Sequence, residues 1–575
     1  MTAFNHRKYS PAPRVPAFNR QWPDRQLEAA PTWVSEDLRD GNQALLEPMS
    51  VEQKKRFWKQ IVRVGIKEVM VGFPSASQPD FDFVRWLIEE EQIPEGVTIA
   101  VLVPCREHLI EKTFDALKGI DRAIIHLYNS TSTTQRERVF EMDRDGIINI
   151  AVSGARWVKA HAERYPAANW RFQYSPESFS STELDFSLAI CEAVMDVWQP
   201  TPDNRCILNL PNTVEVAGPH HHADQIEYFC QHIKNRDSVI ISVHTHNDRG
   251  GAVAAAELAL LAGAERVEGT LLGNGERTGN MDIVTLAMNL YSQGIDPELD
   301  LSRPDEIVQV VTECTGIAMH PRHPWVGEMV YTAFSGSHQD AIRKSLKKQG
   351  DDEPWQVAYL PIDPRDIGRD YQAVIRVNSQ SGKGGMAFLL ERDYGIGLPR
   401  WMMLALAPVV QAESERCSSE LSSAAIRALL FDTFTRAAPL SLADYRLARS
   451  GEESLSITLD DGGERLVLEG SGNGAMSAFM NAWQRHSGQQ VAIIDYSEHS
   501  LGGDSEANAI AFVQLNVDGR RLACVAEDSD TVSASLKAII SGINLAGETA
   551  ADDHGLTAAA QTQGFYQEQA EQRLP

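Results

Sequence analysis

From about residue 33 to 292, short runs rich in β-branched residues alternate with longer helical patterns. Eight such strand–helix units over roughly 260 residues match the length and count of a closed parallel (β/α)₈ TIM barrel. An open, doubly wound sheet is the alternative, but it seldom has eight regular units. The predicted strands are Thr32–Asp40, Glu68–Gly72, Thr98–Val103, Arg122–Asn129, Trp170–Ser175, Cys206–Asn212, Val239–Asn247 and Arg266–Leu272. The predicted helices include Val51–Val64, Phe81–Glu91, Arg106–Lys118, Leu184–Trp198 and Gly251–Ala262.

Polar residues follow the predicted strands where a barrel would need them. In a TIM barrel, functional residues sit at the carboxyl ends of the strands or in the loops that follow. Six candidates fall at or just beyond a predicted strand end: Asp40, Asn129, Glu177, Asn212, His244 and His246. The pattern therefore favours a barrel whose mouth carries the chemistry.

The pattern changes twice after the barrel. Residues 293–440 look helical with interruptions, which indicates a linker region, and a small α+β module follows. Ser454–Leu459 and Arg465–Glu469 flank Asp-Asp-Gly-Gly, a hairpin signal, and the two halves of the module resemble each other weakly. The module's further predicted elements are the helices Ala475–His486 and Thr531–Leu545 and the strands Gln490–Tyr496, Ala509–Val517 and Arg521–Ala526. The predicted divisions are an arm (1–32), the barrel (33–300), linker subdomains (301–440), a C-terminal domain (441–560) and a tail (561–575).

Composition excludes several classes of function. A formal charge of -26 argues against nucleic-acid binding, which needs an extended basic face. Seven scattered cysteines without a Cys-x-x-Cys pair indicate a reducing compartment, and we expect a cytoplasmic protein. No apolar stretch approaches the ~18 residues of a membrane span. The basic, proline-rich first 23 residues are interpreted as a surface arm packed on the body or on a partner, rather than a transit peptide.

His244 and His246 are the strongest candidates for metal ligands. Residues two apart in a strand point to the same side, so both imidazoles can face the barrel mouth. Asp40 at the end of strand one is adjacent once the barrel closes, and the loop 273–280 can bring Asn280 to the same place. This mixed N/O set predicts a divalent cation, Mg²⁺ foremost, with Mn²⁺ or Zn²⁺ as alternatives. The competing interpretation is a pair of buried, hydrogen-bonded histidines.

Three consecutive histidines, His220 to His222, form a second candidate tract. They follow Gly218-Pro219 at the start of a predicted helix, where consecutive residues diverge by ~100°. We therefore interpret them as a solvated helix start rather than as a metal site, the alternative for one of the three being a place in the lining of the barrel rim.

Three motifs together resemble a known acyltransferase family. They are Asp37-Leu38-Arg39-Asp40-Gly41-Asn42-Gln43, His244-Thr245-His246-Asn247-Asp248 and Gly273–Asn280. The family is typified by 2-isopropylmalate, homocitrate and citramalate synthases, and it shares its barrel with 3-hydroxy-3-methylglutaryl-CoA lyase. The linker and C-terminal module are similar to those of 2-isopropylmalate synthases, and the long N-terminal arm and Asn42 resemble the longer-chain branch.

The resemblance implies that acetyl-CoA and 3-methyl-2-oxobutanoate condense, with water, to 2-isopropylmalate and CoA, the first committed step towards leucine. It also implies Asp40, His244, His246 and Asn280 as metal ligands. Arg39 would stabilise developing negative charge, the alternative being an ion pair with a barrel glutamate. Thr213 would bind the carboxylate of the 2-oxo acid, His126 and Ser175 would line the pocket, and Glu177 would orient acetyl-CoA or relay protons.

For two further residues, which lie outside the barrel, the resemblance is the only ground for a predicted role. In similar synthases a pair corresponding to His338 and Tyr371 reaches over the active site of the other subunit and acts in acid/base steps. If that holds here, the enzyme is a homodimer.

The glycine-rich turn of the C-terminal module is a candidate regulatory site. Free backbone N–H groups at Gly470, Gly472, Asn473 and Gly474 could hold a carboxylate at a helix start. The resemblance implies a domain that binds leucine as a feedback inhibitor, and a dimerisation module without a ligand is the alternative.

Three kinds of rival function are compatible with the same barrel. A lyase on the same barrel would be shorter and would carry a cysteine loop after strand eight, which is not found. Homocitrate and citramalate synthases differ mainly in the pocket for the 2-oxo acid. A non-catalytic leucine sensor would not need the metal set or His338 and Tyr371.

Overall fold

The structure is a computed structural model that describes residues 4–369, 383–417, 420–450, 452–502 and 507–551. The chain divides into two compact units. The first comprises Met1–Val330 with Arg365–Gly368, and the second comprises Tyr331–Pro364 with Arg369–Pro575. Among the described residues, no helix is long and apolar enough to cross a membrane. The predicted tail, 561–575, lies outside the described residues.

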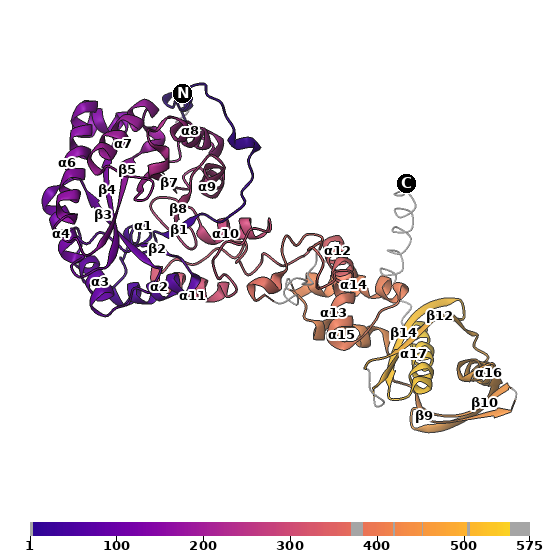
Figure 1. The fold of residues 1–575 in the computed structure, drawn as a ribbon. Coiled ribbons are helices and arrows are strands. Elements are labelled where there is room, and N and C mark those ends of the chain that lie inside the picture. The colour runs from indigo at the N-terminus through magenta and orange to yellow at the C-terminus, as the bar shows by residue number, and fades with distance from the viewer. Residues whose placement is uncertain (1–3, 370–382, 418–419, 451, 503–506, 552–575) are drawn as a thin grey trace. The chain divides into compact units, whose positions relative to one another are not determined.

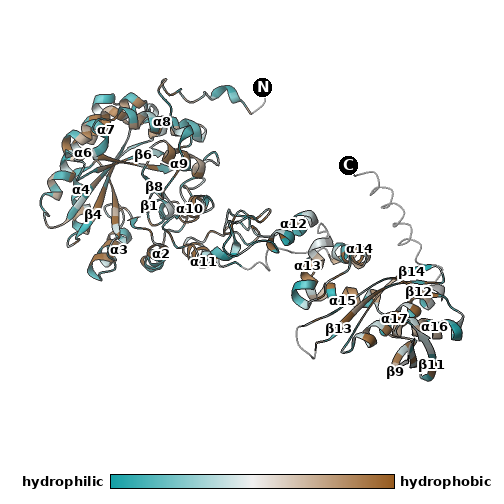
Figure 2. Ribbon diagram, turned by 45° about the vertical axis from the view of Figure 1, so that its right-hand side comes forward, coloured by the Kyte–Doolittle hydropathy of each residue, from teal (hydrophilic) through white to brown (hydrophobic). Residues whose placement is uncertain are grey.

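The first unit is a closed barrel of eight parallel strands in sequential order (Figure 1). The prediction of a TIM barrel is therefore confirmed, and the open-sheet alternative is wrong. Buried aliphatic residues such as Met70, Ala100 and Ile124 pack inside it, and Figure 2 shows hydrophobic stretches among the strands within a ring of more hydrophilic helices. The strands are β1 (Thr32–Ser35), β2 (Glu68–Met70), β3 (Thr98–Pro104), β4 (Arg122–Ser130), β5 (Asn169–Glu177), β6 (Cys206–Asn212), β7 (Val239–Thr245) and β8 (Arg266–Gly269).

The helices around the barrel begin and end at clear signals. In α2 (Val51–Val64), Ser50 and Gln53 form a capping box, and Gly65 ends the helix with φ of 100°. The predicted bounds of α2 and α7 (Leu184–Trp198) match the structure. The other helices of this unit are α1 (Asp40–Gln43), α3 (Gln78–Glu89), α4 (Glu107–Ala116), α5 (Thr133–Gln135), α6 (Arg144–Ala162), α8 (Pro219–His232), α9 (Ala252–Leu261), α10 (Ile283–Tyr291) and α11 (Pro304–Thr315).

The first strand is shorter than predicted. It ends at Ser35, and Asp40 begins the short helix α1, so the prediction that Asp40 ends a strand is wrong. After Ser35 the chain leaves the sheet, and the side chain of Asp37 holds it there. The Asp37 carboxylate accepts hydrogen bonds from Ser35 Oγ and from the backbone N–H of Leu271, just beyond β8. The side chain of Asp40 still reaches the barrel mouth, from a helix rather than from a strand.

The N-terminal arm packs on helix α8. Arg20 and the indole N–H of Trp22 both bond to the carboxylate of Asp224, and the backbone N–H of Gln21 donates to Glu227. His222 on the same helix is buried, 3% exposed, so the predicted solvated helix start does not extend to this histidine. A helix start can bury one residue of three because 100° separates neighbouring side chains.

The second unit contains helices followed by an α+β module. The helices are α12 (Gly336–Leu346), α13 (Lys383–Tyr394), α14 (Arg400–Cys417) and α15 (Ser423–Phe434). In the module, three antiparallel strands and a helix occur twice: β9, β10 and β11 with α16, then β12, β13 and β14 with α17. This repeat agrees with the weak similarity of the two halves. The bounds are β9 (Leu440–Ser450), β10 (Glu452–Asp461), β11 (Glu464–Gly472), α16 (Ala475–Ser487), β12 (Val491–Ser500), β13 (Ala509–Val517), β14 (Arg520–Asp528) and α17 (Thr531–Ala551).

Candidate active site

A cavity of roughly 300 Å³ opens at the carboxyl ends of the barrel strands. Alternate residues of a barrel strand point inward, which is why His126 and Tyr128, or Asn209 and Pro211, line it in pairs. The residues of the lining are Arg39, Asp40, Gln43, Leu102, His126, Tyr128, Ser175, Glu177, Asn209, Pro211, Thr213, His244, His246, Glu276 and Arg277. The structure thus brings most of the sequence candidates of the barrel to one cavity.

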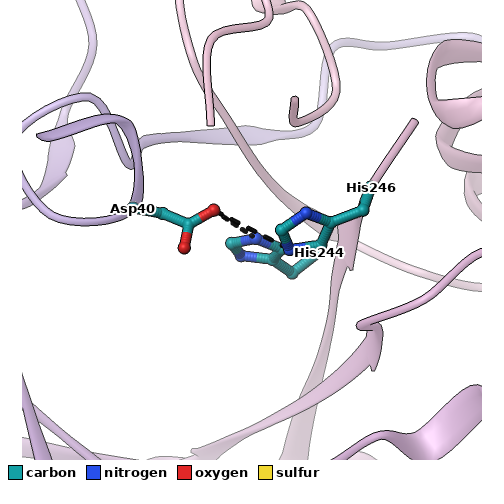
Figure 3. A group of neighbouring side chains, drawn as sticks. All are labelled: Asp40, His244 and His246. Atoms are coloured by element: carbon teal, nitrogen blue, oxygen red, sulfur yellow. Dashed lines mark ion pairs between the residues drawn. The ribbon is translucent and has the colours of Figure 1, made fainter. Parts of the chain in front are cut away.

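Asp40, His244 and His246 meet on one side of this cavity (Figure 3). Oδ2 of Asp40 lies 3.8 Å from Nε2 of His244 and 3.7 Å from Nε2 of His246. Asn280 adjoins the group: its Nδ2 donates to Asp40 Oδ2 at 2.7 Å, and its Oδ1 lies 2.9 Å from His244 Nε2. The loop after β8 therefore delivers Asn280 to the place that the sequence predicted.

This set of donors fits a divalent cation. Ligand atoms of one cation at bond lengths of about 2.1 Å lie roughly 3–4 Å apart, as these do. One carboxylate, two imidazoles and an amide oxygen suit Mg²⁺, Mn²⁺ or Zn²⁺. In addition, the buried Nδ1 of His246 has no hydrogen-bond partner among the described residues, so no hydrogen bond of this atom within that part of the chain fixes the ring.

The electrostatics favour an ionised Asp40. Burial opposes its charge, but Arg39 and the two histidines outweigh burial and hold its pKa well below the usual range. Burial lowers the pKa of His246 to about 3, with the neighbouring His244 adding to the effect, so this ring is neutral near pH 7. Burial also disfavours charge on His244, but hydrogen bonds to Asp40 and Glu268 raise its pKa to about 10.

Arg39 reaches the same mouth. In an extended strand, the neighbours Arg39 and Asp40 would point to opposite sides. Because β1 ends at Ser35, before Arg39, both side chains can line the cavity. Nη1 of Arg39 bonds to Asp40 at 2.8 Å and its Nη2 to Glu36 at 2.6 Å. The ion pair with a barrel glutamate and a place at the cavity are therefore both present, and the two interpretations do not exclude each other.

The remaining candidates of the barrel lie beside the metal cluster. Ser175 Oγ is 2.6 Å from His126 Nε2, and burial lowers the pKa of His126 to about 3, which makes it a neutral hydrogen-bonding group. Glu177 accepts a hydrogen bond from Ser130, and Thr213 Oγ1 accepts one from the backbone N–H of Ser178. Thr213 lines the cavity, so its hydroxyl can donate to a ligand there.

Sequence reasoning missed several residues at this site. Glu268 is fully buried and bonds to His244, and Glu36 is fully buried beside Arg39. Burial raises the pKa of Glu36 to about 7 against the opposing effect of Arg39. A signal for Glu268 was present, because Arg266 and Glu268 place two charges on one side of a strand that an aliphatic barrel would fill with apolar residues.

The other candidates belong to the second unit. His338 lies on α12, is exposed and stacks on Tyr359 at a centroid distance of 4.0 Å; Tyr371 lies outside the described residues. Gly470 and Gly472 end β11, and Gly474 precedes α16. A Cβ on Gly470 would lie 2.1 Å from the carbonyl oxygen of Ala478, so this glycine lets the helix approach the sheet.

Comparisons with known proteins agree along the chain. Residues 30–311 match the HMGL-like family model, residues 328–391 the alpha-isopropylmalate synthase post-catalytic domain-like model, and residues 420–546 the LeuA allosteric (dimerisation) domain.

The chain is 53% identical over 542 residues to a 2-isopropylmalate synthase of Azotobacter vinelandii, covering 94% of this chain and 97% of the relative. It is 52% identical over 551 residues to one of Alcanivorax borkumensis, covering 95% and 98%. A solved HMG-CoA lyase of Bacillus subtilis covers 51% of this chain and 97% of its own length, with 19% identity and a TM-score of 0.41.

Proposed function

The chain belongs to the family of 2-isopropylmalate synthases, and we propose on that premise that the cavity at its barrel mouth is where the reaction takes place. Acetyl-CoA and 3-methyl-2-oxobutanoate condense to 2-isopropylmalate and CoA, and water completes the thioester hydrolysis. The observation that carries the assignment to this cavity is the meeting of Asp40, His244 and His246 within it.

Asp40, His244, His246 and the amide oxygen of Asn280 would hold the cation, Mg²⁺ foremost. When bound, such a cation supplies Lewis-acid polarisation of a ketone chelated beside its carboxylate. Asp40 is kept ionised by Arg39 and the histidines, so this carboxylate is ready to bind a cation near neutral pH.

The other cavity residues would bind and orient the two substrates. Arg39 is a permanent cation 12% exposed, suited to stabilising the oxygen on which negative charge develops. The Thr213 hydroxyl at the cavity can donate to the carboxylate of the 2-oxo acid. The neutral His126 and Ser175 would line the pocket, and Glu177 would orient acetyl-CoA or relay a proton.

The acetyl methyl group is weakly acidic, so its deprotonation needs a positioned base. We assign the acid/base steps to His338 and Tyr371 of the partner subunit in a homodimer. The match of residues 420–546 to a dimerisation domain supports an assembly of two chains. All seven cysteines are free, which is compatible with work in the cytoplasm.

The C-terminal module would bind leucine as a feedback inhibitor. The same match describes this domain as allosteric. The turn Gly472-Asn473-Gly474 enters α16, whose first backbone N–H groups can receive a carboxylate.

A thiol-release assay with acetyl-CoA and a panel of 2-oxo acids tests the function. We expect CoA release with 3-methyl-2-oxobutanoate to exceed that with pyruvate or 2-oxoglutarate. Preference for pyruvate would indicate a citramalate synthase, and preference for 2-oxoglutarate a homocitrate synthase. Leucine binding without CoA release on any 2-oxo acid would indicate a sensor and would remove the proposal.

A further inference from the structure

His244 and Glu268 are register partners on adjacent strands. In the pairing of β7 with β8, His244 lies opposite Glu268 and Val243 opposite Val267. Both polar side chains therefore point into the barrel at the same level, and His244 Nδ1 lies 3.0 Å from Glu268 Oε2. The contact follows from the register of the sheet and does not depend on a flexible loop.

The carboxylate of Glu268 is held from several strands at once. Its Oε1 accepts from Arg266 Nη1 at 2.5 Å and from Gln173 Nε2 at 2.7 Å, and its Oε2 accepts from Asn209 Nδ2 at 3.1 Å. These donors come from β8, β5 and β6. Glu268 is 0% exposed. A carboxylate with so many fixed donors presents a rigid acceptor to His244.

That acceptor determines which nitrogen of His244 is free. Nε2 of His244 faces the oxygens of Asp40 and Asn280. When Nε2 loses its proton on binding a cation, Nδ1–H still donates to Glu268, and the lone pair is then on Nε2. A metal-binding histidine needs an unprotonated nitrogen aimed at the ion, and a carboxylate on the other nitrogen supplies both orientation and basicity. Glu36 also lies close to His244, with Oε2 bound by Arg39 and Oε1 without a hydrogen-bond partner among the described residues. The hydrogen bond of His244 Nδ1 goes to Glu268, not to Glu36.

We propose that Glu268 is the positioning residue that orients His244 for the cation, and that the buried Arg266 fixes Glu268 in turn. This inference rests on the proposed metal site and names a residue that acts on it only through His244. The same carboxylate is linked to the substrate side of the cavity, because Gln173 also approaches His126 and Asn209 also donates to Ser175. A substitution of Glu268 therefore affects both the metal ligand His244 and the residues His126 and Ser175 on the substrate side of the cavity.

Two variants of Glu268 separate orientation from charge. Glu268→Gln keeps the shape and removes the charge. Glu268→Asp keeps the charge and withdraws the carboxylate from His244 Nδ1 by the length of one methylene, roughly 1.5 Å. The matched control is Glu68→Gln: Glu68 accepts from Arg266 Nε at 2.6 Å, so this variant also removes one buried negative charge beside Arg266 but leaves the contact between Glu268 and His244 in place.

The measurement is Mn²⁺ affinity of the full-length protein by equilibrium dialysis, with the EPR signal of bound Mn²⁺ as a second readout. We expect both Glu268 variants to bind Mn²⁺ about 10- to 100-fold more weakly than the original protein, the usual effect of losing such a partner. Glu68→Gln should bind within about twofold of it. Circular dichroism in EDTA confirms that each variant is folded, and Glu268→Asp carries the test if Glu268→Gln does not fold.

Unchanged Mn²⁺ affinity in folded Glu268→Asp, or an equal loss in Glu68→Gln, overturns the positioning role. An unaltered protein that binds no Mn²⁺ at all instead removes the metal site itself. The two failures are therefore distinguishable.

Discussion

Arg277 donates two hydrogen bonds to the carboxylate of Asp248, from Nε at 2.6 Å and from Nη2 at 3.0 Å. The two residues lie on the loops after β8 and β7, and Nη2 of Arg277 also donates to the backbone oxygen of Thr213 beyond β6. One guanidinium thus joins three loops at the mouth of the cavity. Arg277 adopts a φ of 56°, a conformation that side chains other than glycine rarely take. Its contacts hold it there.

Replacing Arg277 with Met should raise the KM for the 2-oxo acid about tenfold, because Thr213 loses a fixed position and 1.4 kcal/mol of binding corresponds to a factor of about ten. The expected change in kcat is smaller. Steady-state kinetics with the 2-oxo acid varied provide the measurement. Arg303→Met, at the exposed start of α11, is the control. A KM that stays the same in Arg277→Met would contradict this role of the loop contacts.

Removing both histidines should abolish specific metal binding. In a His244→Ala, His246→Ala double variant, only Asp40 and Asn280 of the proposed ligands remain, and two oxygen ligands hold a divalent cation poorly. Metal analysis after dialysis against Mn²⁺ should show close to one ion per chain in the unaltered protein. In the double variant, the metal content should be a small fraction of that value. Undiminished metal content in the double variant would end the metal-site hypothesis.

A mixture of inactive variants tests the partner's contribution. If His338 acts on the barrel of the other subunit, a heterodimer of His338→Ala and His244→Ala chains has one complete site. Random mixing should then restore about one quarter of full activity, since half of the dimers are mixed and each mixed dimer has one intact site. Each variant alone serves as the baseline. No recovery after subunit exchange counts against the arrangement in trans.

Leucine should bind the C-terminal module and slow the reaction. Isothermal titration should give a saturable heat, and Asn473→Ala should weaken binding at least several-fold while uninhibited turnover stays the same, because Asn473 lies at the entry to α16. Gln484→Ala, on the exposed side of the same helix, is the control. Absence of both heat and inhibition with the unaltered protein would remove the regulatory proposal.

Stability should fall in mild acid because of His222. Burial lowers the pKa of this histidine to about 4, so the unfolded chain binds the proton more readily than the folded one between pH 6.5 and 4. The stability from keeping His222 neutral is therefore present above pH 6.5 and is lost as the pH falls to 4, by about 3 kcal/mol at most.

The measurement is the free energy of unfolding of the barrel as a function of pH. His222→Gln cannot gain charge, so its curve should be flatter across this window. His232→Gln, exposed at the end of the same helix, should keep the slope of the unaltered protein. Parallel curves for all three proteins would show that His222 does not contribute.

The sequence alone determined the barrel, because alternation of strand and helix patterns is a local property that eight repeats make unambiguous. It also determined which residues converge: His244 and His246 share a strand face by period, and closure of the barrel brings Asp40 and Asn280 beside them. The motifs then indicated the family, which the relatives confirm.

Only the tertiary structure decided how these side chains are held. Asp40 lies on a short helix because Asp37 bonds to Leu271, 234 positions away, and no local pattern encodes that contact. Glu268 faces His244 because two strands pair in one register, and Arg277 joins three loops that are distant in the chain. Burial likewise depends on packing, which is why His222 is buried although its neighbours in the sequence suggested solvent. Local periodicity specifies elements, whereas long-range hydrogen bonds and burial specify the site.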